Sequence, residues 1–196
     1  MSKTPDPYPV TDKEKIPALG AALYEMQQFC NCVEVLRKGP DQVTENAFLE
    51  SMLIHVRVLQ DFFQKGTRRH RKGKELDDVL SKDFEFLPEP IPLRPDYESR
   101  IDKEVAHLTY SRARRITRAE KEWEPDAFLE LVIRCIKFIE FIETHDQEIL
   151  RDLEQFRAKH PIPALHPAQV KAELTKMRVS FEITAQRKSS STGVSG

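Results

Sequence analysis

The sequence contains few cysteines, few glycines and no excess of charge of either sign. Its 196 residues include 3 Cys and 6 Gly, and 31 Lys and Arg residues nearly balance 32 Asp and Glu residues, for a formal net charge of -1. An odd, small number of cysteines argues against a disulfide scaffold and is typical of a reducing compartment, so we predict a cytoplasmic protein. The balanced charge excludes a chain-wide attraction to nucleic acid or to a membrane surface. Any basic binding surface must be local.

Long apolar segments and cofactor motifs are also missing. The most apolar run, FLELVIRCIKFIEFIE, is interrupted by charged side chains, which excludes an ordinary membrane span. The first residues, MSKTPDPYPVTDKEK, lack the apolar segment of a signal peptide. We find no nucleotide-binding loop, no metal-ligand spacing and no serine–histidine elbow, and therefore predict no metal and no cofactor.

Helical periodicity is the main structural signal. An apolar stripe with steps of four and three predicts a helix from about residue 17 to 38, followed by Gly39 and Pro40. The same rhythm predicts one long helix from about 125 to 159, in which Asp146 is the sole interruption. Further helices are expected at about 43–64, 95–115 and 168–183. Since no segment alternates like a strand, we predict an all-α, up-and-down bundle of four main helices with short additional helices.

The length fits a single domain, which we place at residues 16–183. Residues 1–15 are polar and proline-rich, and residues 184–196 are of low complexity, so both are predicted to be disordered tails. Between the second and third main helices lie a basic run, KGTRRHRKGK, and the segment ELDDVLSKDF, which is expected to add a short helix. The proline-rich LPEPIPLRP that follows predicts an extended loop.

The predicted helix at 43–64 is apolar nearly all round but carries a polar stripe, with Asn46, Glu50, Arg57 and Asp61 on one face. Because a lone charge is costly to bury, such a stripe needs partners within itself. We therefore predict a buried structural ion network of Glu50, Arg57 and Asp61. His55 lies off this stripe and is interpreted as a packed or solvated histidine.

The stretch RIDKEVAH is the strongest candidate for chemistry. On a helix, Arg100 and His107 differ by about 20° in azimuth and about 10 Å along the axis, so both can face one phosphate. The guanidinium can stabilise charge and the imidazole can exchange a proton, as metal-independent cleavage of RNA requires. The alternative is a surface arginine paired with Asp96 or Glu104, and a histidine at the edge of the core.

These features resemble the HEPN superfamily (higher eukaryotes and prokaryotes nucleotide-binding), whose signature is R-x4-6-H. The segments NAFLESMLIHVRVLQDFF, DDVLSKDF and RIDKEVAHLTYSR are also similar to a group of bacterial HEPN-like proteins of unassigned function. The resemblance implies a helical bundle that dimerises and brings two motifs into one cleft. It also implies that Arg100 and His107 form the catalytic pair, with Glu50 as the acidic residue on the neighbouring helix. The sequence departs from the pattern at Ile101, where the residue after the arginine is usually polar.

Two functions remain open. The first is a metal-independent RNase that acts as a homodimer in a toxin or defence context. Its RNA contacts would come from two basic clusters, Arg68, Arg69 and Arg71, and Arg112 and Arg115, although such runs are more often solvated loops. The second is a non-catalytic helical module that binds a nucleotide or a protein partner such as an antitoxin.

Overall fold

The computed structural model describes residues 10–68, 78–93, 97, 100, 101, 123, 125–159 and 166–191. This part of the chain is helical and contains no strand, so the predicted all-α bundle is confirmed. None of its helices is long and apolar enough to cross a membrane. The α-helices with several turns are α1 (Asp12–Arg37), α2 (Gln42–Gln64), α6 (Leu129–His145), α7 (Gln147–Lys159) and α8 (Pro167–Ser191), and two short 3-10 helices are η1 (Ser81–Phe84) and η3 (Pro125–Phe128).

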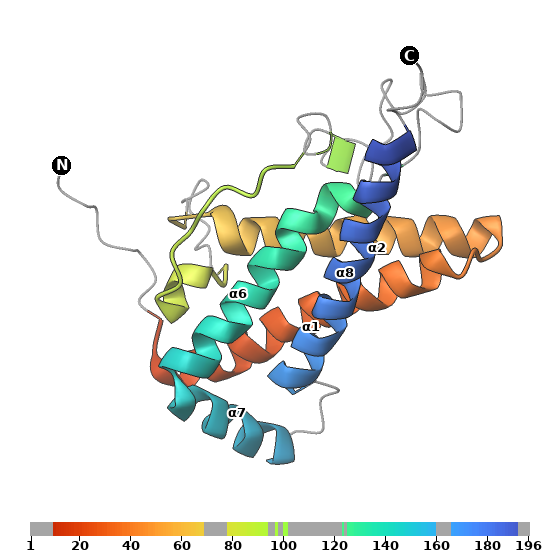
Figure 1. Cartoon of the computed structure of the whole chain (residues 1–196). Coiled ribbons are helices and arrows are strands. Elements are labelled where there is room, and N and C mark those ends of the chain that lie inside the picture. The colour runs from red at the N-terminus through yellow and green to blue at the C-terminus, as the bar shows by residue number, and fades with distance from the viewer. Residues whose placement is uncertain are drawn as a thin grey trace, which may run out of the picture.

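The bundle consists of two helix pairs that cross one another (Figure 1). Helices α1 and α2 run antiparallel and pack along their length, and α6 and α8 form the second antiparallel pair. The shorter α7 contacts α1. Aromatic rings fill the space between the end of α2 and α6. Phe138 of α6 lies in edge contact with Phe62, Phe63, Phe84 and Phe86, at 5.2 to 5.8 Å between ring centres.

Helix α1 buries the stripe that the periodicity predicted. The buried side chains of this stripe are Leu19, Leu23, Met26, Cys30 and Val33. The helix begins at Asp12, earlier than the predicted start near Pro17, because Thr11 and Glu14 cap it. The backbone N–H and the hydroxyl of Thr11 both donate to Glu14 Oε2, at 2.9 and 2.7 Å. The predicted disordered tail at 1–15 therefore extends too far into the chain.

The predicted long helix at 125–159 is wrong in one respect, since α6 and α7 are separate. Asp146 leaves the helical conformation, with φ -138 and ψ 68. Its carboxylate accepts a hydrogen bond from the Ile149 N–H at 3.0 Å and so begins a new helix. The change of direction lets Leu153 pack against Gly20 of α1.

Helix α8 also differs from its predicted end near residue 183. It continues to Ser191, so most of the predicted C-terminal tail at 184–196 is helical. Its buried residues Val170, Leu174, Met177 and Phe181 keep helical spacing. Hydrogen bonding within the helix continues beyond them, as from the Thr184 hydroxyl to the Ser180 carbonyl. In the segment 75–84, where a short helix was predicted, the described residues form the 3-10 helix η1.

Candidate functional site

Arg100 is the member of the predicted catalytic pair that the structure describes. Its residue is 5% exposed, and its guanidinium carbon lies 4.0 Å from the centre of the Trp123 ring and 5.5 Å from that of Tyr97. The Tyr97 and Trp123 rings meet edge to face at 4.9 Å, and Phe128 of η3 is stacked beyond Trp123. Cation–π attraction grows as the two groups are removed from water, and here Arg100 and Tyr97 are buried while Trp123 is partly exposed. Arg100 is therefore part of a buried aromatic cluster.

The burial of Arg100 differs from the exposed arginine of one sequence interpretation. The partners that this interpretation gave it, Asp96 and Glu104, lie outside the described residues. Ile101, the departure from the family pattern, is buried beside it, as an apolar residue at a core position should be. His107 lies outside the described residues.

Glu50, Arg57 and Asp61 lie on the outer side of α2, because Val56, Leu59 and the paired Phe62–Phe63 face the core. Arg57 Nε and Asp61 Oδ2 are 3.8 Å apart, and the two side chains are 47% and 41% exposed. The predicted contact between Arg57 and Asp61 is present, but its predicted burial is wrong. Glu50 is exposed on the same side of α2.

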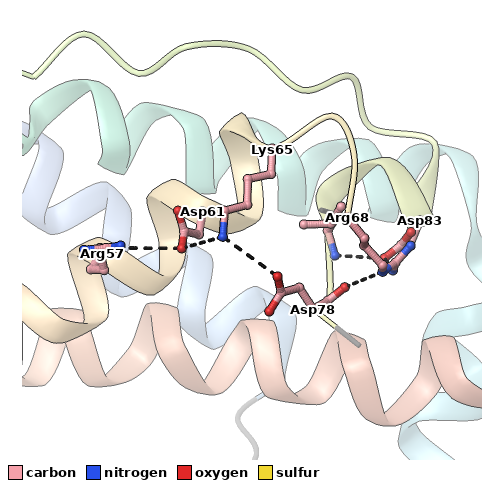
Figure 2. Close-up of polar contacts among 7 residues, drawn as sticks. Arg57, Asp61, Lys65, Arg68, Asp78 and Asp83 are labelled. Carbon is pink, nitrogen blue, oxygen red and sulfur yellow. Dashed lines mark hydrogen bonds and ion pairs between the residues drawn. The ribbon is translucent and has the colours of Figure 1, made fainter. Parts of the chain in front are cut away.

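Among the residues that the structure describes, the ion pair with both side chains buried joins Arg68 to Asp83, just beyond the end of α2 (Figure 2). Arg68 Nη2 and Asp83 Oδ2 are 2.5 Å apart, with side chains 2% and 7% exposed. Arg68 Nε also donates to the Asp78 carbonyl at 2.8 Å, and Asp83 accepts from the Leu80 N–H at the same distance. Lys65, directly after α2, links the helix to this region, because its Nζ lies 2.8 Å from Asp61 Oδ2 and 3.8 Å from Asp78 Oδ2 (Figure 2).

Arg68 was predicted to contact nucleic acid, and its position contradicts that role. Its guanidinium is turned inward, where it joins the residues after α2 to η1 (Figure 2). A side chain with almost no exposed surface offers no donor to a phosphate in solution. The other predicted contacts, Arg69, Arg71, Arg112 and Arg115, lie outside the described residues.

His55 has partners that sequence patterns alone did not identify. Its Nδ1 lies 2.6 Å from Glu25 Oε2 on α1, and its Nε2 lies 3.4 Å from the Ser51 hydroxyl one turn earlier on α2. The Ser51–His55 spacing of four residues is visible in the sequence. The Glu25–His55 contact spans 30 positions and required the packing of α1 on α2.

A cleft of about 440 Å³ lies between the C-terminal part of α1 and α8. Its apolar lining comes from Cys30, Val33 and Met177, and its charged lining from Glu34, Arg37, Lys38, Glu173 and Lys176. Burial, with a smaller contribution from the Glu173 carboxylate, raises the pKa of the Cys30 thiol to about 12. The cysteine is therefore a neutral, apolar part of the lining and a poor nucleophile.

Compared with models of protein families, with curated proteins and with solved structures, the chain matches none. The case for any function therefore depends on the geometry described above.

Proposed function

We propose that this chain is a helical module that binds a protein partner, and that its R-x6-H motif is not an RNase centre. The observation that carries the proposal is the burial of Arg100 against Trp123 and Tyr97. A cation accelerates the cleavage of RNA only if its interaction with the transition state is stronger than the interactions it makes before the reaction. For Arg100, those earlier interactions are the contacts with its own rings. Arg100 would have to leave its rings to contact the transition state.

Leaving the rings is costly. A cation–π contact contributes about 0.5–1 kcal/mol at an exposed site and about 2 kcal/mol when desolvated, and Arg100 lies over one buried and one partly exposed ring of the same cluster. Tyr97 is itself among the most buried large side chains, so movement of Arg100 would disturb the packing beneath it. These contacts favour a structural role for the arginine and the non-catalytic interpretation of the helix that carries it.

The cleft between α1 and α8 is the docking site we propose. Its apolar residues can accept an apolar side chain, and its rim offers both signs of charge. Within the rim, Lys38 pairs with Glu34 at 3.0 Å and Lys176 with Glu173 at 2.7 Å. Arg37 adds one further positive charge at the end of α1. A protein segment with an apolar residue next to an acidic one matches this arrangement.

A nucleotide fits the same cleft less well. The cleft adjoins the last turns of α1, where the helix dipole places partial negative charge, whereas phosphates bind at helix N-termini. Two glutamates also line it. Both features oppose the several charges of a polyphosphate more than they oppose a segment with a single acidic residue, which favours the protein partner over the nucleotide.

A displayed library of random peptides, selected on the immobilised full chain, tests the proposal. We expect enriched peptides that combine acidic and apolar residues, with affinities measurable by fluorescence anisotropy. Reversing charge in Arg37→Glu with Lys176→Glu should weaken their binding about tenfold or more. Arg151→Glu, an exposed substitution on α7, should leave it unchanged. Peptides that bind both variants as they bind the wild type would place the docking surface elsewhere and remove the case for this cleft.

A further inference from the structure

Ser51, His55 and Glu25 form a relay where α1 packs against α2. The Ser51 hydroxyl lies 3.4 Å from His55 Nε2, and Glu25 Oε2 lies 2.6 Å from His55 Nδ1. The two ring nitrogens thus have different partners, one a hydroxyl and the other a carboxylate. His55 and Glu25 are partly exposed, as is Ser51, so solvent molecules and small reagents can reach the group.

The carboxylate determines which nitrogen of His55 carries the proton. An ionised carboxylate only accepts hydrogen bonds, so in the neutral ring the proton lies on Nδ1, toward Glu25. Nε2 then has a free lone pair toward Ser51. This is the arrangement in which a histidine removes a proton from a serine while an acidic residue holds the ring in place.

Cys32 supplies a further neighbour on the α1 side. Burial raises the pKa of its thiol, and a hydrogen bond between the thiol and the Ser51 hydroxyl partly offsets that effect. The neutral thiol can donate to Ser51 Oγ, which leaves the hydroxyl proton of Ser51 for His55 Nε2. Next to Ser51 on the surface of α2 are the exposed apolar side chains Ile54 and Val58.

We infer that Ser51 is an activated nucleophile that accepts an acyl group from a small activated ester or thioester. Ser51 Oγ forms a bond to the acyl carbon as its proton passes to His55 Nε2. The bond from that carbon to the leaving group then breaks, and the leaving group departs with the proton from His55. A short apolar acyl chain can lie against Ile54 and Val58.

The product should accumulate as a stable ester. Ser51 lies in the interior of α2, so its backbone N–H belongs to the hydrogen bonds of the helix and cannot serve an oxyanion. Oxyanion donors contribute a large share of the rate in acyl transfer. With none from the Ser51 backbone, the serine ester is hydrolysed slowly, because its leaving group is poorer than that of the activated ester that formed it. The group is therefore a stoichiometric acyl acceptor, independent of the proposed docking cleft.

The test treats the full chain with p-nitrophenyl acetate and follows both nitrophenolate release and the mass of the protein. We expect a burst near one equivalent and an acetyl group on Ser51, located by peptide mass spectrometry and removed by hydroxylamine as an ester is. Ser51→Ala should abolish the burst, and His55→Gln should slow it about 10²-fold or more. Glu25→Gln should slow it about tenfold or more, because the amide no longer selects the correct tautomer.

His166 provides a matched control, since it pairs with Glu154 at 3.1 Å and no serine contact to it is found in the described residues. His166→Gln should acylate like the wild type. Each variant is compared with wild type by thermal melting, and Ser51→Ala with Glu25→Gln still decide the outcome if His55→Gln does not fold. Acetylation confined to lysines, or an unchanged burst in Ser51→Ala, would overturn the inference.

Discussion

At the scale of single residues, burial separates charged groups that resemble one another in the sequence. Arg57 lies in helix α2 and Arg68 just after its end, and each is paired with an aspartate. The Arg57–Asp61 pair is half exposed, whereas the Arg68–Asp83 pair is almost completely enclosed. Exposed pairs contribute little to stability, while removal of one partner from an enclosed pair leaves a buried charge behind.

Arg68→Met should therefore lower the free energy of unfolding by about 3–5 kcal/mol, because Asp83 would lose its buried partner. The matched substitution Arg57→Met should cost less than about 1 kcal/mol. Urea denaturation of the two variants and the wild type measures the difference. Equal losses in both variants would show that the Arg68 site is as solvated as the Arg57 site.

The thiol of Cys30 gives stability a dependence on pH. Its folded pKa of about 12 lies above the ordinary value of 9.0, so the folded state holds the proton more tightly than the unfolded state does. The stabilisation of the folded state that comes from this protonated thiol is complete below pH 9 and is lost as the pH rises toward 12.

Compared with Cys30→Ala, the wild type should thus lose part of its stability advantage across that interval. Urea denaturation of both proteins at several pH values measures it, and the comparison cancels the titration of residues common to both. An advantage that is constant with pH would mean that Cys30 ionises equally in the folded and unfolded chain.

At the scale of elements, helix ends depend on side-chain caps as much as on periodicity. Asp146→Ala should remove the bond to the Ile149 N–H and cost about 1 kcal/mol. The break between α6 and α7 should remain, because Ile149 and Leu153 are buried in their present direction. Thermal melting measures the loss. Gln155→Ala, an exposed change on the same helix, should stay within about 0.5 kcal/mol of wild type, and an equal loss there would argue against capping by Asp146.

The helices could be predicted from the sequence because their apolar stripes repeat locally. The predicted apolar face of α1 is buried. Along η3, α6 and α7 the predicted stripe is buried from its first member to the seventh, and Phe156 at its end is partly exposed; the buried members are Phe128, Val132, Cys135, Ile139, Ile142, Ile149 and Leu153. The break at Asp146 was missed because the heptad-like rhythm continues through it. The polar stripe of α2 was predicted to be buried, but its residues Asn46, Glu50, Arg57 and Asp61 lie on the solvent side. Composition alone does not show which face of a helix its neighbours cover.

At the scale of the whole molecule, the candidate sites depend on contacts between distant segments. Glu25 meets His55 across α1 and α2, and Trp123 covers Arg100. Local spacing carries no information about these partners, so the sequence could single out Arg100 but could not show that aromatic rings enclose it. The predicted homodimer stays a prediction, and sedimentation equilibrium of the purified chain measures it.

The most direct test of the account asks whether Arg100 stabilises the fold or cleaves RNA. Purified wild type and Arg100→Met are each incubated with a broad panel of single-stranded RNAs in EDTA, and each is melted in parallel with Arg37→Met as the control for an exposed arginine. We expect intact RNA with every protein, and a loss of about 2 kcal/mol or more in Arg100→Met alone, because its cation–π contacts are gone. Cleavage of RNA by the wild type that disappears in an equally stable Arg100→Met would contradict it and restore the arginine to an active site.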